Sequence, residues 1–256
     1  MSIAFFDVDG TLLAKPSLER RFFRTLRWQG KIPVANYLGW ITEAIRLGLR
    51  DVRASAQGNK MYLRGVSAEI LSLRIANDPK FPWRGRPEFF PAAIQRVWWH
   101  ALRGDSIVLV SGTLAPLAEI AKFALERELL LRGVETKVLM LATQLEIRDR
   151  RWTGQVAGVP MFGEAKAEAI KRFAREQGAS LARCSAYGDS ALDRSMLACV
   201  GYPFAINPTR RLLQIARRRG WQILAWADGA VANCGAITNR AVVRTAGEHR
   251  NLKRAL

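Results

Sequence analysis

Residues 1–12 read Met-Ser-Ile-Ala-Phe-Phe-Asp-Val-Asp-Gly-Thr-Leu, and this stretch decides the fold. An apolar run of strand length, residues 2–6, stops at two carboxylates that lie two positions apart. Such a run, bounded by a turn signal, is typical of a buried strand. Gly10 allows the backbone to turn after it. We therefore expect a central strand whose carboxyl end presents Asp7 and Asp9.

The rest of the chain divides into two kinds of pattern. Residues 17–76 lack strand patterning and repeat apolar side chains at helical spacing, as at Leu18, Phe22 and Leu26, and again at Ile70 and Leu73. Proline-rich residues 77–91 predict a loop. After that loop, apolar strands alternate with helices. The strands are expected at 106–110, 137–142, 184–187, 202–206 and 222–225, the helices at 92–103, 115–131, 164–177, 191–199 and 210–219, and a hairpin at 144–159.

This alternation predicts an α/β fold, a Rossmann-like parallel sheet with helices on both faces. The helical block after the first strand then forms an inserted, mostly helical domain. Ligands in such sheets bind beyond the carboxyl ends of the strands. Each acidic or hydroxyl motif of this sequence lies at one of those ends, so we expect a single site there.

The composition is that of a globular protein with an unusual charge. The chain has 256 residues, with 40 Lys and Arg against 22 Asp and Glu, a net charge of +18. Residues 15–88 hold 15 basic and 6 acidic residues, and residues 207–256 hold 10 and 2, which gives local charges of +9 and +8. Such a field attracts phosphate esters, nucleic acid or acidic lipids. It is equally compatible with a soluble, arginine-rich surface.

Several classes of protein are disfavoured. The apolar stretch at residues 36–49 contains Glu43 and Arg46, which predicts an amphipathic helix rather than a membrane span. Asp7 and Asp9 interrupt the N-terminal apolar run, which argues against a signal peptide. Three cysteines without metal-ligand spacing fit a reducing compartment, so we expect a cytoplasmic protein.

Asp7 and Asp9 carry the central chemical hypothesis. Two carboxylates around one turn can divide the work of phosphate-ester hydrolysis: one attacks phosphorus and the other protonates the leaving oxygen and later activates water. The alternative is a surface Asp-Gly turn after a strand.

Three further residues could bind the phosphate. The Ser111 hydroxyl and the Gly112 amide, which follow the second strand, could donate to a phosphate oxygen. The alternative role of Ser111 is a helix N-cap. Lys166, early on a predicted helix, could neutralise the phosphate, although it could equally be a solvated surface lysine.

Asp189 and Asp193 could hold a metal. They occur in Gly-Asp-Ser-Ala-Leu-Asp after a short strand. Carboxylate oxygens at a strand end suit Mg²⁺, with Asp193 one helical turn beyond Asp189. The alternative is an acidic first turn that complements the helix dipole.

These four motifs, taken in order, resemble those of the haloacid dehalogenase superfamily. They are Phe-Asp-Val-Asp-Gly-Thr-Leu (6–12), Val-Ser-Gly-Thr (110–113), Gly-Glu-Ala-Lys (163–166) and Gly-Asp-Ser-Ala-Leu-Asp (188–193). The helical insertion, Thr-Gly-Gln-Val (153–156) and the stretches 200–208 and 219–221 resemble the phosphoserine-phosphatase-like branch, subfamily IB. The resemblance covers about residues 3–226.

The resemblance implies a magnesium-dependent phosphomonoesterase. Asp7 would be the nucleophile and Asp9 the general acid and base, and Ser111, Gly112 and Lys166 would bind phosphate. Mg²⁺ would be held by Asp7, the Asp9 backbone carbonyl and Asp189, with Asp193 supporting the metal shell. The phosphatase core would comprise residues 1–16 and 85–226, the cap residues 17–84, and a basic C-terminal extension residues 227–256.

The substrate is less well determined. Ser190 and Leu192 replace the Gly and Asn of the usual last motif, and Pro16 stands where the cap's substrate-recognising Glu is expected, which disfavours phosphoserine. A small phosphorylated metabolite is the leading prediction. The first alternative is a lipid phosphate such as phosphatidylglycerophosphate, hydrolysed peripherally at the inner face of an anionic membrane. The docking aromatics would be Tyr37, Trp40, Trp98 and Trp99, unless these pack in the core. A nucleic-acid-binding protein is disfavoured because no recognition motif is present.

Overall fold

The central feature of the fold is a six-stranded parallel sheet in the order β3-β2-β1-β6-β7-β8. The computed structural model describes residues 1–49, 58–71 and 87–226. The strands are β1 (Ile3–Phe6), β2 (Ser106–Leu114), β3 (Leu139–Thr143), β6 (Ser185–Gly188), β7 (Tyr202–Ile206) and β8 (Gln222–Leu224). The predicted α/β class with a parallel sheet is confirmed. Strand order reverses around β1, so its carboxyl end lies at the topological switch point where such sheets bind ligands.

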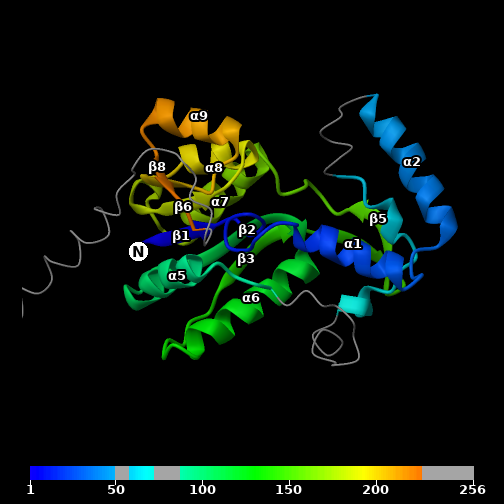
Figure 1. Ribbon diagram of the computed structural model, residues 1–256, viewed down its shortest axis with the longest axis horizontal. Helices are drawn as coiled ribbons and strands as arrows, with labels where there is room; N and C mark the ends of the chain where they lie inside the picture. The colour runs from blue at the N-terminus through cyan, green and yellow to red at the C-terminus, as the bar shows by residue number, and fades with distance from the viewer. Residues whose placement is uncertain (50–57, 72–86, 227–256) are drawn as a thin grey trace, which may run out of the picture.

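Helices cover both faces of the sheet (Figure 1). Alternate residues of β1 point to opposite sides: Phe6 packs in one core cluster and Phe5 in the other. The Phe6 side is covered by α5 (Pro91–Leu102) and α6 (Ala115–Leu130), and the Phe5 side by α7 (Glu164–Glu176), α8 (Arg194–Ala198) and α9 (Arg210–Arg219). Burial on both faces explains why the strands are apolar throughout rather than alternating.

A second group of elements lies at one end of the sheet (Figure 1). It contains α1 (Leu18–Trp28), α2 (Val34–Gly48), two 3-10 helices, η1 (Met61–Leu63) and η2 (Ala68–Leu71), and a two-stranded antiparallel sheet, β4 (Leu145–Arg148) with β5 (Arg151–Val156). The ring of Phe22 contacts Trp152 edge-to-face at 6.2 Å, and the Gly65 amide donates to the Trp152 carbonyl at 2.8 Å. The β4–β5 hairpin therefore joins the inserted helices, a contact that the sequence pattern did not predict.

Some predicted boundaries change. β2 continues through Leu114 rather than stopping at residue 110. The helix predicted at 191–199 divides into η4 (Ala191–Asp193) and α8, and a third short 3-10 helix, η3 (Leu181–Arg183), precedes β6. The helical pattern at Ile70 corresponds only to η2. Leu73, most of the predicted loop 77–91 and the C-terminal extension 227–256 lie outside the described residues. No helix within the described ranges is long and apolar enough to cross a membrane.

Candidate active site

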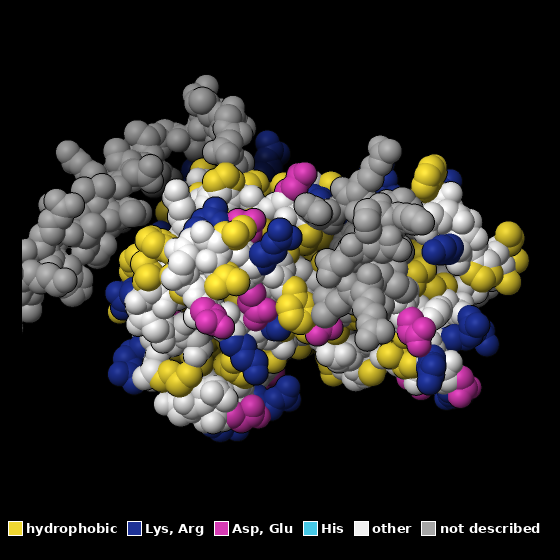
Figure 2. Space-filling view, turned by 90° about the horizontal axis from the view of Figure 1, so that it is seen from below, with side chains coloured by type: hydrophobic (Ala, Val, Ile, Leu, Met, Phe, Trp, Pro, Cys, Tyr) yellow, Lys and Arg dark blue, Asp and Glu magenta, His cyan; other side chains and the backbone are white. Residues whose placement is uncertain are grey.

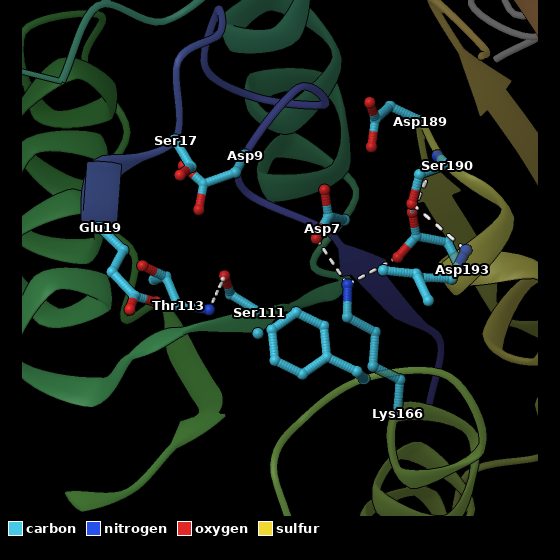
Figure 3. Close-up of a pocket in the computed structure, with 13 residues that line it drawn as sticks. Asp7, Asp9, Ser17, Glu19, Ser111, Thr113, Lys166, Asp189, Ser190 and Asp193 are labelled. Atoms are coloured by element: carbon cyan, nitrogen blue, oxygen red, sulfur yellow. Dashed lines mark hydrogen bonds and ion pairs between the residues drawn. The ribbon is translucent and has the colours of Figure 1, made fainter. Parts of the chain in front are cut away.

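A cavity of about 160 Å³ opens at the carboxyl end of β1. The residues predicted from sequence all line it: Asp7, Asp9, Ser111, Gly112, Lys166, Asp189 and Asp193. They come from four segments far apart in the chain. Figure 3 shows these side chains converging from the strand ends and from α7. The structure thus brings the whole predicted set together.

Asp7 lies at the centre of the hydrogen-bond network. Its side chain is buried, the Thr11 hydroxyl donates to Oδ2 at 2.9 Å, and the Lys166 ammonium donates to Oδ1 at 2.6 Å. Burial raises the pKa of Asp7, Lys166 lowers it, and the carboxylates of Asp193 and Asp189 raise it further. A divalent cation among these groups would favour the ionised, nucleophilic form.

Lys166 is fixed between two carboxylates. It lies in the first turn of α7, which begins after Gly163 in the left-handed region at a φ of 56°. Its ammonium donates to Asp7 Oδ1 and Asp193 Oδ1, both at 2.6 Å. Burial lowers the pKa of Lys166, but Asp193 and Asp7 outweigh that effect and hold its pKa above its usual value. The surface-lysine alternative is therefore wrong, since the side chain is 3% exposed.

Asp193 holds Lys166 in place. Its second oxygen, Oδ2, accepts from the Ser190 amide and from the Ser190 hydroxyl, each at 3.0 Å, in a capping box at the start of η4. Ser190, which replaces a glycine of the usual motif, therefore fixes the carboxylate that orients the lysine.

Asp9 is suited to proton transfer. Its Oδ1 accepts from the Leu18 amide at 2.8 Å, at the start of α1. Burial raises the pKa of Asp9 to about 6, although the Leu18 hydrogen bond opposes the shift. A carboxyl group that titrates near neutrality can donate a proton and then accept one. The Asp9 carboxylate lies outside the three-carboxylate group described below.

Ser111 and Gly112 form one wall of the cavity. The Ser111 hydroxyl accepts from the Thr113 amide at 3.1 Å, and both residues lie within β2. The N-cap of α6 is Leu114, so the N-cap alternative for Ser111 is wrong. A Cβ on Gly112 would overlap the ring of Phe162, so only glycine fits this wall.

Three acidic side chains lie close enough together to bind one hard cation. Oxygens of Asp7, Asp189 and Asp193 all lie within 4.8 Å of one another. Asp189 Oδ2 is buried and forms an ion pair with the exposed Lys15 ammonium at 2.8 Å. An all-oxygen set of this kind fits Mg²⁺. Both oxygens of Asp7 and both of Asp193 already accept hydrogen bonds. Asp189, whose ion pair is with the exposed Lys15, is therefore the carboxylate most available to bind the cation.

Four residues that the sequence did not single out also line the cavity: Ser17, Glu19, Thr113 and Phe162. Glu19, in the first turn of α1, and Thr113, in β2, lie on the same side of it (Figure 3). Pro16 occupies the position where an acidic residue was expected, and the structure brings Glu19 into the cavity instead. In the sequence, the only indication of this role was that Glu19 is an acidic residue three positions after Pro16.

The cavity combines a buried lysine, which bridges a candidate nucleophile and a second carboxylate, with a cluster of acidic oxygens. These groups lie at the switch point of an α/β sheet and suit the hydrolysis of anionic substrates. Comparison with known proteins leads to the same class. The haloacid dehalogenase-like hydrolase family matches residues 4–198. The chain therefore belongs to the haloacid dehalogenase-like hydrolases, and within them it is similar to the phosphoserine phosphatases.

Two curated relatives and one solved structure illustrate the similarity. "Probable phosphatase Rv3661" of Mycobacterium tuberculosis is 40% identical over 240 residues, covering 88% of this chain and 75% of the relative. "Phosphoserine phosphatase SerB1" of the same organism is 31% identical over 235 residues, covering 86% and 69%. A crystal structure of a protein of unknown function from Bordetella pertussis Tohama I superposes with a TM-score of 0.64 at 26% identity, covering 87% of this chain and 97% of that one.

Proposed function

We propose that this protein is a magnesium-dependent phosphomonoesterase that works through an aspartyl-phosphate on Asp7. The observation that carries the proposal is the position of Lys166, whose ammonium touches both Asp7 and Asp193 inside the cavity. A buried cation in hydrogen-bond contact with the nucleophile is placed to bind the phosphate that this nucleophile attacks.

The proposed reaction has two steps. The ester phosphate binds against Ser111, Gly112 and Lys166, and an oxygen of Asp7 attacks phosphorus. The bond from phosphorus to the ester oxygen breaks, and Asp9 protonates the departing alkoxide. Asp9, now ionised, removes a proton from a water molecule that attacks the acyl-phosphate, which releases phosphate and restores Asp7. Mg²⁺, held by Asp7 and Asp189, would offset the negative charge of the phosphoryl oxygens.

A direct test compares Asp7→Asn with the wild-type protein on p-nitrophenyl phosphate and on a panel of phosphorylated metabolites, with and without Mg²⁺. We expect the variant to lose at least about 10³-fold in turnover, because the nucleophile is removed. Asp149→Asn is the matched control, since Asp149 lies outside the cavity at a φ of 51° that asparagine tolerates. Full magnesium-dependent activity in Asp7→Asn would refute the mechanism.

The substrate is proposed to be a small ester. The cavity, at about 160 Å³, is smaller than the roughly 300–1,000 Å³ of most drug-sized ligand pockets. The inserted segment, residues 17–84, would act as a cap over it, with residues 1–16 and 85–226 as the core. No feature of the site supports nucleic-acid binding. If the protein did bind nucleic acid, the substitution Asp7→Asn should leave that affinity unchanged.

A second candidate is attachment to an anionic membrane surface, favoured by the outward face of α2. Its apolar side chains point to solvent: Val34, Leu38, Ile41 and Ile45 are 80%, 65%, 52% and 59% exposed. The inward face of α2 is also apolar, since Trp40 packs against Phe23 and Tyr62. Figure 1 places α2 at one end of the molecule, and Figure 2 shows hydrophobic, basic and some acidic side chains interspersed at that end. An apolar helix face within a strongly cationic protein complements an acidic lipid surface.

The aromatic residues first considered for this role do not form one surface. Trp98 and Tyr37 are partly buried against the core, and Trp99 lies on α5, with the Arg103 guanidinium 4.6 Å from its ring. The candidate surface is instead the outward face of α2. A cytoplasmic protein with this surface would attach at the inner membrane face.

Vesicle sedimentation tests this second candidate. Wild-type protein should bind phosphatidylglycerol vesicles at low salt and not phosphatidylcholine vesicles, and Leu38→Ser with Ile41→Ser should weaken binding. Equal recovery of the double variant and the wild type would exclude this face. A change of oligomeric state in the double variant would indicate instead that the face contacts a second copy.

A further inference from the structure

Thr113 carries a hydroxyl group that the fold does not use. The residue is 4% exposed, and its Oγ1 makes no hydrogen bond within the described part of the chain. Its amide is satisfied by the Ser111 hydroxyl. A buried hydroxyl without a partner is destabilising, so retention of one on a cavity wall points to a ligand that completes it.

Glu19, on the same side of the cavity, accepts hydrogen bonds from the described residues at only one of its oxygens. Oε1 accepts from the Lys60 ammonium at 2.6 Å and from the Tyr62 hydroxyl at 2.9 Å. Neither of these donors lines the cavity, whereas Glu19 does. Both of these hydrogen bonds go to Oε1, so Oε2 is the oxygen of this cavity-lining carboxylate that is available to a ligand.

The Lys60 ion pair determines what Oε2 can accept. The Lys60 side chain is 4% exposed and that of Glu19 is 20% exposed, so the charge of the carboxylate is already compensated by a buried ammonium. A second ammonium from a substrate would place two cations on one carboxylate and would have to lose its own hydration. It would also offer no acceptor to the Thr113 hydroxyl proton. A neutral hydroxyl has neither disadvantage, since it can donate to Glu19 and accept from Thr113.

We infer that Thr113 and Glu19 form a subsite for a hydroxyl group of the ester's alcohol portion. The substrate is then the phosphate ester of a small, uncharged compound that carries at least one further hydroxyl group, and not of an amine or an amino acid. This inference rests on the proposed phosphatase function and adds the class of substrate to it. Lys60 and Tyr62 act as positioning residues because they set the charge and orientation of Glu19 from behind.

Three esters of nearly equal size test the inference: 2-hydroxyethyl, propyl and 2-aminoethyl phosphate. They differ only in a terminal hydroxyl, methyl or ammonium group. We expect wild-type kcat/KM to be at least about tenfold higher for the hydroxyethyl ester than for either of the others, because a polar subsite rejects a ligand that leaves it unpaired. Hydrolysis of p-nitrophenyl phosphate, which does not depend on the subsite, reports the proposed function separately.

Thr113→Val removes the hydroxyl and keeps the shape. It should lower kcat/KM for the hydroxyethyl ester by about three- to tenfold while the hydroxyethyl-to-propyl ratio falls toward one. Its melting temperature should equal or exceed that of the wild type, because the lost hydroxyl had no partner. Thr42→Val is the matched control, because Thr42 lies exposed on α2 and donates to the Gly39 carbonyl. This variant should leave kcat/KM unchanged for all three esters.

Lys60→Met leaves Glu19 uncompensated, and it should raise the aminoethyl-to-hydroxyethyl ratio. If this variant does not fold, Thr113→Val decides alone. The inference is overturned if the wild type prefers the aminoethyl ester, or if Thr113→Val lowers all three esters equally. It is also overturned if none of the esters is hydrolysed or competes with p-nitrophenyl phosphate. Loss of p-nitrophenyl phosphate hydrolysis itself would instead refute the proposed function.

Discussion

The floor of the cavity and the second group of elements are built in different ways. The floor is made of residues next to strand ends, such as Asp7 and Asp189, whose places follow from the pairing of β1 with β2 and β6. The second group, α1, α2 and the β4–β5 hairpin, meets through side-chain packing, and its α1 contributes Glu19 to the cavity. Backbone pairing fixes a position to within a residue, whereas helix packing tolerates many sequences. The floor therefore carries a recognisable motif and the second group does not.

The largest difference in turnover should appear between variants of two buried lysines: Lys166, next to the catalytic carboxylates, and Lys60, behind Glu19. Lys166→Met should lower turnover on every substrate by about 10³-fold and destabilise the protein by about 3–5 kcal/mol, since Asp7 and Asp193 lose their shared cation. Lys60→Met should retain turnover of p-nitrophenyl phosphate. Kinetics and urea unfolding measure both.

The control for Lys166 lies on the same helix. Lys171 pairs with Glu168 at the surface, and Lys171→Met should change stability by less than about 1 kcal/mol. If Lys166→Met behaved like Lys171→Met, the floor would not depend on its buried cation and the contrast drawn above would be lost.

The buried polar groups beneath the floor should make the sheet side sensitive to pH. His100 bonds to Asp105 at 2.7 Å and to the Tyr187 hydroxyl at 2.8 Å, and burial lowers its pKa to about 4. Between that value and about 6.5 the unfolded chain binds a proton that the folded protein does not. The free energy of unfolding should therefore be fully retained above pH 6.5 and fall by up to about 3 kcal/mol as the pH drops through this window.

Urea unfolding at several pH values measures this loss, with His100→Gln as the comparison. The variant should lose less stability between neutral pH and pH 4.5 than the wild type. Parallel pH profiles for the two proteins would show that His100 does not contribute. The described elements of the second group contain no histidine, so this sensitivity belongs to the sheet side.

Substitutions at Gly112 and Gly39 should show that side chains pack tightly at the floor of the cavity and less tightly around α2. Gly112→Ala should cost about 1–3 kcal/mol and reduce activity, because the new methyl group overlaps Phe162 and displaces its ring. Gly39, inside α2, would place its Cβ 3.7 Å from Met61, an ordinary contact. Gly39→Ala should therefore stabilise the protein by about 0.5–1 kcal/mol. Thermal unfolding of both variants distinguishes the sites, and equal effects would contradict the distinction.

The metal itself should have a modest effect on stability. Mg²⁺ at about ten times its dissociation constant should add about 1.4 kcal/mol to the free energy of unfolding, and EDTA should remove that gain. Asp189→Asn should abolish the shift because it removes a ligand, whereas Glu43→Gln on α2 should leave it intact. A shift retained in Asp189→Asn would place the cation elsewhere.

The sequence by itself determined the parallel sheet, the order of the elements along the chain and seven of the residues that line the cavity together. Each of these depends on local patterns: apolar runs of strand length, and acidic or hydroxyl residues where they stop. Parallel strands then bring their carboxyl ends to one edge, so residues 7, 111 and 189 meet without further information.

Only the tertiary structure decided the surroundings of that floor. Glu19 enters the cavity, Lys60 neutralises it from behind, and Trp152 ties the hairpin to α1. These contacts join residues that share no period and no motif. The physical reason is that side-chain packing depends on shape and distance between whole elements, which local patterns do not encode, whereas hydrogen-bonded strands carry their register in the order of the chain.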